Sequence, residues 1–164
     1  MFDWFRKKAP TSDAIRVFQL RQELAADIAG VFAVYRERRL VPLAKGYLDV
    51  FRDRLQKALK REDAPPRLLA EAETTVLDEQ IDDLKSKLFA EALEKMAALF
   101  KLAEGFDVRP EIEEATRDSV AQFCEELRAA GVKVIEQYAP VIADADRVWR
   151  QKYPEKVAQF TKKG

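Results

Sequence analysis

The stretch that decides the fold is PRLLAEAETTVLDEQIDDLKSKLFAEALEKMAALFKLAE, which occupies residues 66–104. Its apolar side chains recur three or four residues apart, which places them on one side of a helix with 3.6 residues per turn. A helix of this length extends for roughly 60 Å. We expect its buried stripe to consist of Leu69, Ala72, Val76, Leu77, Ile81, Leu84 and Leu88, widening into Phe89, Ala92, Met96, Leu99, Phe100 and Ala103.

On the C-terminal side of this stretch, a second long helix is predicted to pack back against the first. Gly105 stands where a left-handed C-cap glycine is expected, and Arg109-Pro110-Glu111 opens the next helix with a proline in its first turn. The apolar stripe continues past Gly131 and past Pro140, so we expect a helix that is kinked at the proline and ends near residue 152. Pro154 then begins a last short helical segment.

On the N-terminal side, the chain breaks firmly at Ala64-Pro65-Pro66, and Asp63 is a candidate cap for the helix that follows. Before the break, apolar stripes predict helices over residues 12–39 and 42–61. Pro42 removes an amide donor between them and disfavours helical geometry at the preceding residue. The sequence leaves open whether the chain turns back here or continues as one kinked helix, although the short, glycine-free connection favours the kink.

The composition supports an all-helical fold. The chain has 164 residues, the size of one domain, and 48% of them are hydrophobic, which excludes wholesale disorder. Only 5 are glycines, and strong helix formers dominate. We predict an all-α protein, an elongated antiparallel three- or four-helix bundle with long, partly proline-kinked helices. The bundle domain covers residues 12–162, after an N-terminal tail at residues 1–11.

Most catalytic chemistries are excluded by what the chain lacks. The chain has no histidine, so it contains neither a Ser-His-Asp nor a Cys-His arrangement, and no histidine-containing zinc site. Its one cysteine, Cys124, cannot form a disulfide within the chain, and we interpret it as a small, half-buried side chain. Gly-rich phosphate-binding loops are missing as well. We therefore expect a protein that is not an enzyme and uses no cofactor.

One acidic cluster keeps a metal-dependent alternative open. Four carboxylates follow one another within little more than one turn, and two more come later in the same helix; they are Asp78, Glu79, Asp82, Asp83, Glu91 and Glu94. Carboxylates spaced this way could hold Mg²⁺ or Ca²⁺. We interpret the cluster as a solvated helix face, with no metal site. A Mg²⁺-dependent all-α hydrolase is the minor alternative, because no second helix repeats a comparable acidic pair outside a first turn.

The formal net charge is zero, yet the charges are unevenly distributed along the chain. Residues 1–61 carry 14 Lys and Arg against 7 Asp and Glu, residues 62–127 carry 7 against 18, and residues 128–164 carry 8 against 4. This basic, acidic, basic pattern predicts that oppositely charged helices lie side by side. The alternative is a basic face for an anionic partner.

Three surfaces combine aromatic and basic residues and are the candidate contact sites. The first is the N-terminal tail, with Phe2, Trp4, Phe5, Arg6, Lys7 and Lys8. The second is the basic helix at 42–61, with Arg52, Arg54, Lys57, Lys60 and Arg61. Both could meet a protein partner or an anionic membrane surface. The third is a C-terminal patch of Arg147, Trp149, Arg150 and Tyr153, for which core packing is the default interpretation, although its composition is also typical of protein contacts.

From these surfaces we expect a non-enzymatic interaction protein that binds another protein or its own copy. A peripheral membrane protein that uses the N-terminal tail and the basic helix is the alternative. Nucleic acid is an unexpected partner, because no binding motif occurs and the overall charge is balanced. The sequence says nothing of small-molecule ligands. Without a signal peptide or an apolar run near 20 residues, we expect a cytoplasmic protein, with membrane association as an option.

Overall fold

The computed structural model describes residues 12–99 and 109–161, so the N-terminal tail and Gly105 lie outside it. The described residues contain helices and no strands. In chain order these are α2 (Ser12–Tyr35), the π-helical turn η1 (Arg36–Leu40), α3 (Val41–Leu59), α4 (Pro66–Leu99), α5 (Arg109–Lys152) and α6 (Pro154–Thr161). The prediction of an all-α protein is confirmed.

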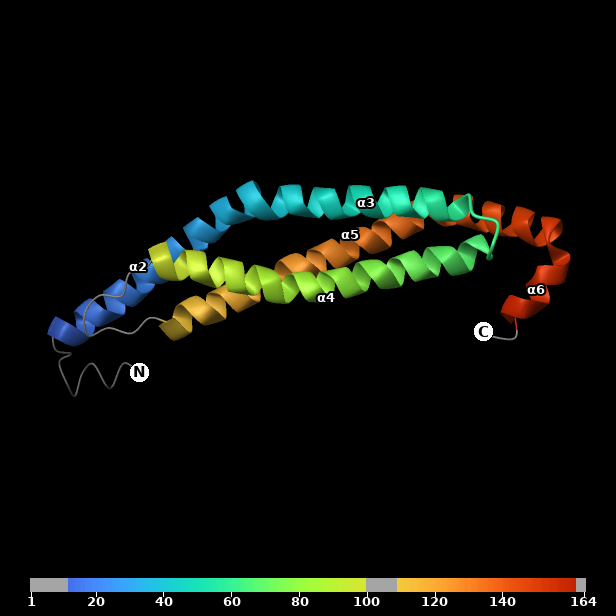
Figure 1. The fold of residues 1–164 in the computed structure, drawn as a ribbon. Coiled ribbons are helices and arrows are strands. Elements are labelled where there is room, and N and C mark those ends of the chain that lie inside the picture. The colour runs from blue at the N-terminus through green and yellow to red at the C-terminus, as the bar shows by residue number, and fades with distance from the viewer. Residues whose placement is uncertain (1–11, 100–108, 162–164) are drawn as a thin grey trace, which may run out of the picture.

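Three long arms lie lengthwise beside one another (Figure 1). α2, η1 and α3 form one arm that bends at η1, and α4 and α5 form the other two. α4 packs most extensively on α5, and α3 lies against both. Short α6 turns back at the end of α5. The chain therefore continues through Pro42 as one bent arm, which is the kinked alternative that the short connection favoured.

The bend in the first arm is a wide helical turn just before Pro42. The Val41 amide donates to the Arg36 carbonyl, five residues back, instead of four as in an α-helix. Pro42 has no amide to continue the usual ladder, and it occupies the first turn of α3, where that loss costs little. Because the turn is wide, Tyr35 and Leu40 are both buried although they are five residues apart.

The core is a continuous apolar seam where the three arms meet. Each arm contributes fully buried side chains at helical spacing: Ile28, Phe32, Phe51 and Leu55 from the first arm, Leu77, Ile81, Leu84, Leu88 and Met96 from α4, and Val120, Phe123, Leu127 and Val134 from α5. Burying each large aliphatic side chain contributes about 1.5–3 kcal/mol. The predicted α4 stripe is mostly buried as far as Met96, except that Ala72 is exposed and Val76 and Phe89 are half-buried. The burial of the last three predicted positions, Leu99, Phe100 and Ala103, lies outside the description.

Gly131 of α5 packs directly against Leu77 of α4. A Cβ atom at this position would lie 2.7 Å from Cδ2 of Leu77, so the glycine lets the two helices pack tightly. α5 runs through Gly131 and Pro140 without ending, as the continuous stripe predicted. Gly30 and Gly46, by contrast, have no atom within 4 Å of such a Cβ, so nothing in the described residues requires a glycine at either position.

A clasp at the far end ties the α3–α4 connection to α5. Pro65 precedes α4 and offers no side-chain acceptor, and the Asp146 carboxylate from α5 instead accepts from the Arg67 amide at 3.1 Å. Arg150 Nε donates to the same carboxylate at 2.7 Å. Trp149 Nε1 donates to the Glu62 carbonyl at 2.9 Å. The prediction that Asp63 caps α4 was wrong, because Asp146 takes that role and Asp63 pairs with Arg61.

Alanine substitutions should separate the glycine that packs from those that do not. Gly46→Ala should raise the free energy of unfolding by about 0.5–1 kcal/mol, because alanine restricts the unfolded chain and favours helix. Gly131→Ala should lower it, because the new methyl group collides with Leu77 inside the core. Urea denaturation of both variants measures the difference. A Gly131→Ala protein as stable as Gly46→Ala would contradict the tight contact.

Removing the clasp should destabilise the α3–α4 end. Asp146→Ala leaves the Arg67 amide without its acceptor and should lower the free energy of unfolding by about 2 kcal/mol. Asp144→Ala is the matched control, because Asp144 pairs only with exposed Arg147 on its own helix and should change stability by less than about 0.5 kcal/mol. Equal losses in the two variants, measured by thermal and urea denaturation, would argue against the clasp.

Candidate functional site

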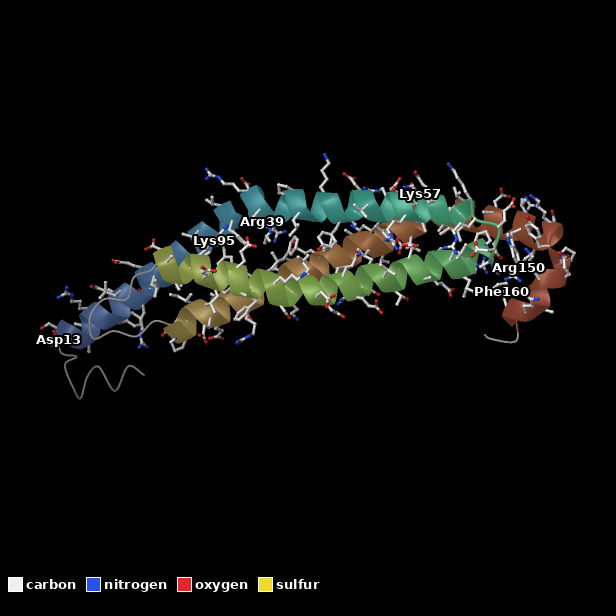
Figure 2. The ribbon with its side chains drawn as sticks, viewed as in Figure 1. Asp13, Arg39, Lys57, Lys95, Arg150 and Phe160 are labelled. Atoms are coloured by element: carbon white, nitrogen blue, oxygen red, sulfur yellow. The ribbon has the colours of Figure 1, made fainter. Side chains whose placement is uncertain are left out.

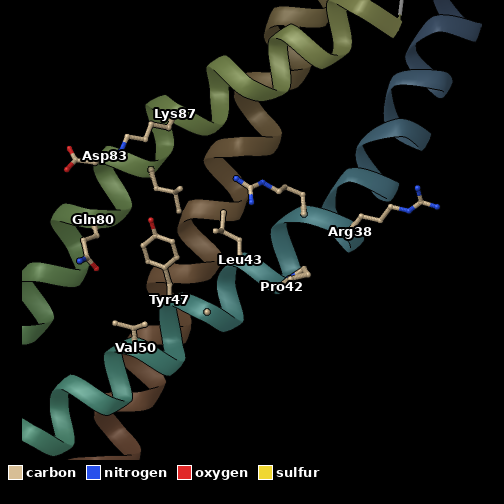
Figure 3. Close-up of a pocket in the computed structure, with 11 residues that line it drawn as sticks. Arg38, Pro42, Leu43, Tyr47, Val50, Gln80, Asp83 and Lys87 are labelled. Atoms are coloured by element: carbon tan, nitrogen blue, oxygen red, sulfur yellow. The ribbon is translucent and has the colours of Figure 1, made fainter.

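Two surface hollows flank η1, and both lie between the first arm and α4. The first, of about 670 Å³, has one wall from α3 and one from α4 (Figure 3). Pro42, Leu43, Gly46, Tyr47 and Val50 form the α3 wall, and Gln80, Asp83, Leu84 and Lys87 form the α4 wall. In Figure 3 the Tyr47 ring lies between the two helices.

The second hollow, of about 870 Å³, lies on the other side of η1. α2 lines it with mostly small or apolar residues, namely Ala26, Asp27, Gly30, Val31, Val34 and Tyr35, and α4 contributes Lys95 and Met96. Arg38 and Arg39 line both hollows. The two hollows therefore follow one another along the contact between the first arm and α4, and we call them together the seam groove.

A polar bridge crosses the seam groove at its middle. The Tyr35 hydroxyl donates to Glu91 Oε1 at 3.1 Å, and Arg39 donates to both oxygens of the same carboxylate, at 3.1 and 3.2 Å. Lys95 lies 3.6 Å from Glu91 and 5.3 Å from the centre of the Tyr35 ring. Figure 2 shows Arg39 and Lys95 close together between the arm and α4. The bridge fixes η1 to α4 and divides the groove in two.

The bridge shifts the proton affinities of its members in opposite directions. Burial, and then the adjacent Glu91 carboxylate, raise the pKa of Tyr35 from 10.0 to about 12. The hydrogen bonds from Arg39 and Tyr35, against the opposing effect of burial, hold the pKa of Glu91 below its ordinary value. At neutral pH the phenol therefore stays protonated and donates, while the carboxylate stays charged and accepts.

Most of the predicted basic surface on α3 is occupied by neighbouring carboxylates. Arg52 pairs with Asp49, Lys57 with Asp53 and Arg61 with Asp63, all over short chain distances. Arg54 reaches across to Glu73 of α4 at 2.7 Å. Lys60 alone of the five predicted cations has no carboxylate partner among the residues that the structure describes.

The cross-arm ion pairs explain the uneven charge distribution along the chain. Arg36 pairs with Glu126 of α5, Arg39 with Glu91 of α4, and Arg54 with Glu73 of α4. The basic first arm thus lies against the acidic part of the chain, which is what the basic, acidic, basic pattern predicted. Each such exposed pair contributes about 0.2–1 kcal/mol.

The central aromatic residue of the predicted C-terminal patch lies inside the fold. Trp149 is buried, packs against Tyr153 and Phe160, and is a part of the clasp. Its ring therefore supports the fold and is not offered to a partner. Arg150 pairs with Asp146, and Arg147 pairs with Asp144. Tyr153 is half-buried and lies among exposed basic side chains. The predicted N-terminal contact at residues 2–8 lies outside the described residues.

The acidic cluster of α4 is bridged by an arginine. Arg128 of α5 contacts Asp82 at 2.8 Å, Glu125 at 3.4 Å and Asp78 at 3.5 Å. Within residues 12–99 and 109–161, no group of three or more Asp, Glu or Cys side chains is arranged to hold a metal ion. Cys124 is buried, and its burial raises the pKa of the thiol.

Sequence reasoning missed the seam groove and its bridge. The sequence places Glu91 only in an acidic run, and it predicts no contact for Tyr35. The signal that could have indicated the groove was the presence of Gly30 and Gly46 inside predicted helices, because a mid-helix glycine destabilises a helix unless packing requires it. Contact between Tyr35 and Glu91, 56 residues apart, is a product of tertiary packing.

No family model, curated protein or solved structure matches this chain. None of the helices in the described part of the chain has both the length and the low charge that a membrane span requires.

Breaking the bridge at Glu91 should change the titration of Tyr35. In Glu91→Gln the neighbouring negative charge is gone, so the pKa of Tyr35 should fall from about 12 toward 10.0, and remain above it because burial persists. NMR of ¹³C-labelled tyrosine, with the resonance assigned from Tyr35→Phe, measures this shift. Glu94→Gln, on the exposed side of the same helix, should leave the tyrosine titration unchanged.

The same substitution should make a pH-dependent difference to stability. Because the folded pKa of Glu91 lies below its ordinary value of 4.5, the bridge stabilises the fold above that pH and loses its contribution as the pH falls through the folded pKa. At neutral pH the free energy of unfolding of the wild type should exceed that of Glu91→Gln by about 1 kcal/mol. Urea denaturation should show this difference shrinking below pH 4.5. A difference that is constant with pH would contradict the charged bridge.

Proposed function

We propose that the protein is a non-enzymatic interaction protein whose arms form an elongated antiparallel three-helix bundle, and that the seam groove binds an amphipathic helix of a protein partner. The observation that carries the proposal is the seam groove itself. Two hollows with largely apolar walls follow one another along α4, at the place where a fourth helix of a bundle would lie.

The length of the seam groove suits a helix. Its α4 wall runs from Gln80 to Met96, a distance of about 24 Å given the rise of an α-helix. A partner helix of four to five turns would span both hollows and pass over the Tyr35–Glu91–Arg39 bridge between them, with apolar side chains at positions i, i+3, i+4 and i+7 facing the two hollows.

The glycines of the first arm support close approach of such a helix. Gly30 lines one hollow and Gly46 the other, and each faces open space. A mid-helix glycine destabilises the arm by about 0.5–1 kcal/mol relative to alanine. The monomer shows no packing reason for that cost, whereas a bound helix backbone supplies one.

Charges on the rim indicate the polar chemistry of the partner. Arg38 stands where the two hollows meet, extends away from α4 (Figure 3), and has no carboxylate partner among the described residues. Asp27 and Asp83 line the outer parts of the two hollows. A partner helix with an acidic residue near its middle and basic residues toward its ends would complement this order.

The alternative functions are less well supported. Four of the five predicted cations of the basic helix are already paired with carboxylates, so they offer little free positive charge to an anionic membrane surface. For the Mg²⁺-dependent alternative, the acidic cluster faces Arg128. Both alternatives would need residues that the structure does not describe.

Filling the seam groove should abolish partner binding without harming the fold. Helical peptides of about 18 residues, the length the groove accommodates, can be selected from a displayed library against the wild-type chain. Gly46→Phe should lower the affinity of the selected peptides by about tenfold or more, because the phenylalanine ring occupies the place where they bind. Gly46→Ala, which adds little bulk, should bind nearly normally.

A charge reversal on the rim of the seam groove is the second test of the same proposal. Arg38→Glu should discriminate against peptides with a central acidic residue and favour those with a central lysine. Val141→Phe, on the exposed face of α5, is the control for a surface aromatic elsewhere. Selected peptides that bind Gly46→Phe and the wild type equally would place the interaction outside the groove.

A further inference from the structure

The outer face of α2 carries a continuous strip without a single charge. Its central positions are spaced alternately by three and four residues, at Ile15, Phe18, Gln22, Ala25 and Ala29. Ser12, Gln19, Ala26 and Ala33 lie beside them at helical spacing, and all nine residues are exposed. In a chain of which 35% is charged, nine adjacent uncharged surface residues are a distinct feature.

Nothing in the described residues covers this strip. Phe18 is 62% exposed and Ile15 is 43% exposed, whereas Ile28, Phe32 and Tyr35, on the neighbouring face of α2, are buried in the core. α2 forms one end of the elongated molecule (Figure 1). Burial of Ile15 and Phe18 against a covering partner would remove apolar surface from water and so stabilise this end.

The strip has the shape of a surface that complements itself. Its N-terminal part carries the large side chains Ile15 and Phe18, and its C-terminal part carries only alanines. When two such helices lie antiparallel, the large end of each faces the small end of the other. Positions spaced by three and four residues are those that meet along the seam of two packed helices.

We propose that two copies of this chain associate through α2, with the two helices antiparallel about a two-fold axis. In this register Phe18 of each copy packs over the partner's Ala29, and Gln22 packs beside the partner's Ala25. Each contact occurs twice, as a closed two-fold interface requires. Large side chains meet small ones throughout, which lets the two backbones approach closely.

The size pattern favours a second copy over a different protein as the occupant, because the strip itself supplies both the large and the small half of an antiparallel contact. A strip without charge faces itself without repulsion between like charges, and it offers no ionic group to select a charged partner. The strip and the seam groove share only Ala26. Dimerisation through α2 therefore leaves most of the groove open, and it goes beyond the proposed function, because a dimer would present two grooves.

The oligomeric state of the full chain tests this inference. Sedimentation velocity from micromolar to millimolar concentration should show a reversible dimer. Phe18→Glu should raise the dissociation constant by about 100-fold or more, because it places two charges in the interface. Val141→Glu is the matched control: this valine is 54% exposed on α5, and the substitution should leave the dimer intact. Circular dichroism should show unchanged helix content in both variants.

Cross-linking tests the register. In a Cys124→Ser background, a mixture of Phe18→Cys and Ala29→Cys chains should form a disulfide-linked dimer under mild oxidation, and neither variant should do so efficiently alone. Efficient linking of Phe18→Cys to itself would overturn the antiparallel register.

Two further outcomes would overturn the inference. One is a chain that remains monomeric at millimolar concentration. The other is a dimer that survives Phe18→Glu and dissociates in Gly46→Phe, which would place the second copy in the seam groove. If the chain forms the dimer but no selected helical peptide binds in the seam groove, that result would count against the proposed function alone.

Discussion

The hydrogen bond from the Val41 amide to the Arg36 carbonyl determines how the first arm lies on the rest of the molecule. Because Pro42 cannot donate, the helix widens for one turn, and this turn lets the arm bend without ending. It also brings Tyr35 and Leu40 to the core together and directs Arg39 toward Glu91 of α4. π-helical turns of this kind are frequent at functional sites, and here the turn lies between the two hollows of the seam groove.

Electrostatics and packing act together along the arms. The apolar seam supplies most of the stabilisation, and the ion pairs between the basic first arm and the acidic helices align the arms in register. At the far end, the Asp146 carboxylate caps a helix that begins at Pro66, directly after Pro65, so α5 completes the connection between α3 and α4. The chain thus uses polar contacts where helices begin and bend, and apolar contacts between those points.

The proposed function follows from surfaces that this arrangement leaves uncovered. Three arms enclose a core but leave one seam open, and α2 keeps an uncharged outer strip exposed. The groove has walls from two helices and a mixed-charge rim, which suits a helix from another protein. The strip lies on a single helix and complements itself, which suits a second copy. Neither surface requires a reactive group, in keeping with a function in binding.

The sequence by itself determined the helical class and nearly all of the helix boundaries. These follow from local physics: apolar spacing identifies α4 and α5, and the prolines at 42, 65 and 66 mark bends and starts. It also predicted that basic and acidic segments lie side by side. Only the tertiary structure decided that the arm bends without reversing, that Asp146 and not Asp63 caps α4, and that Trp149 lies inside. The seam groove and the Tyr35–Glu91–Arg39 bridge were equally beyond the sequence. Each of these joins residues that are far apart in the chain, and helical periodicity specifies which face of a helix is apolar without specifying which helix will cover it.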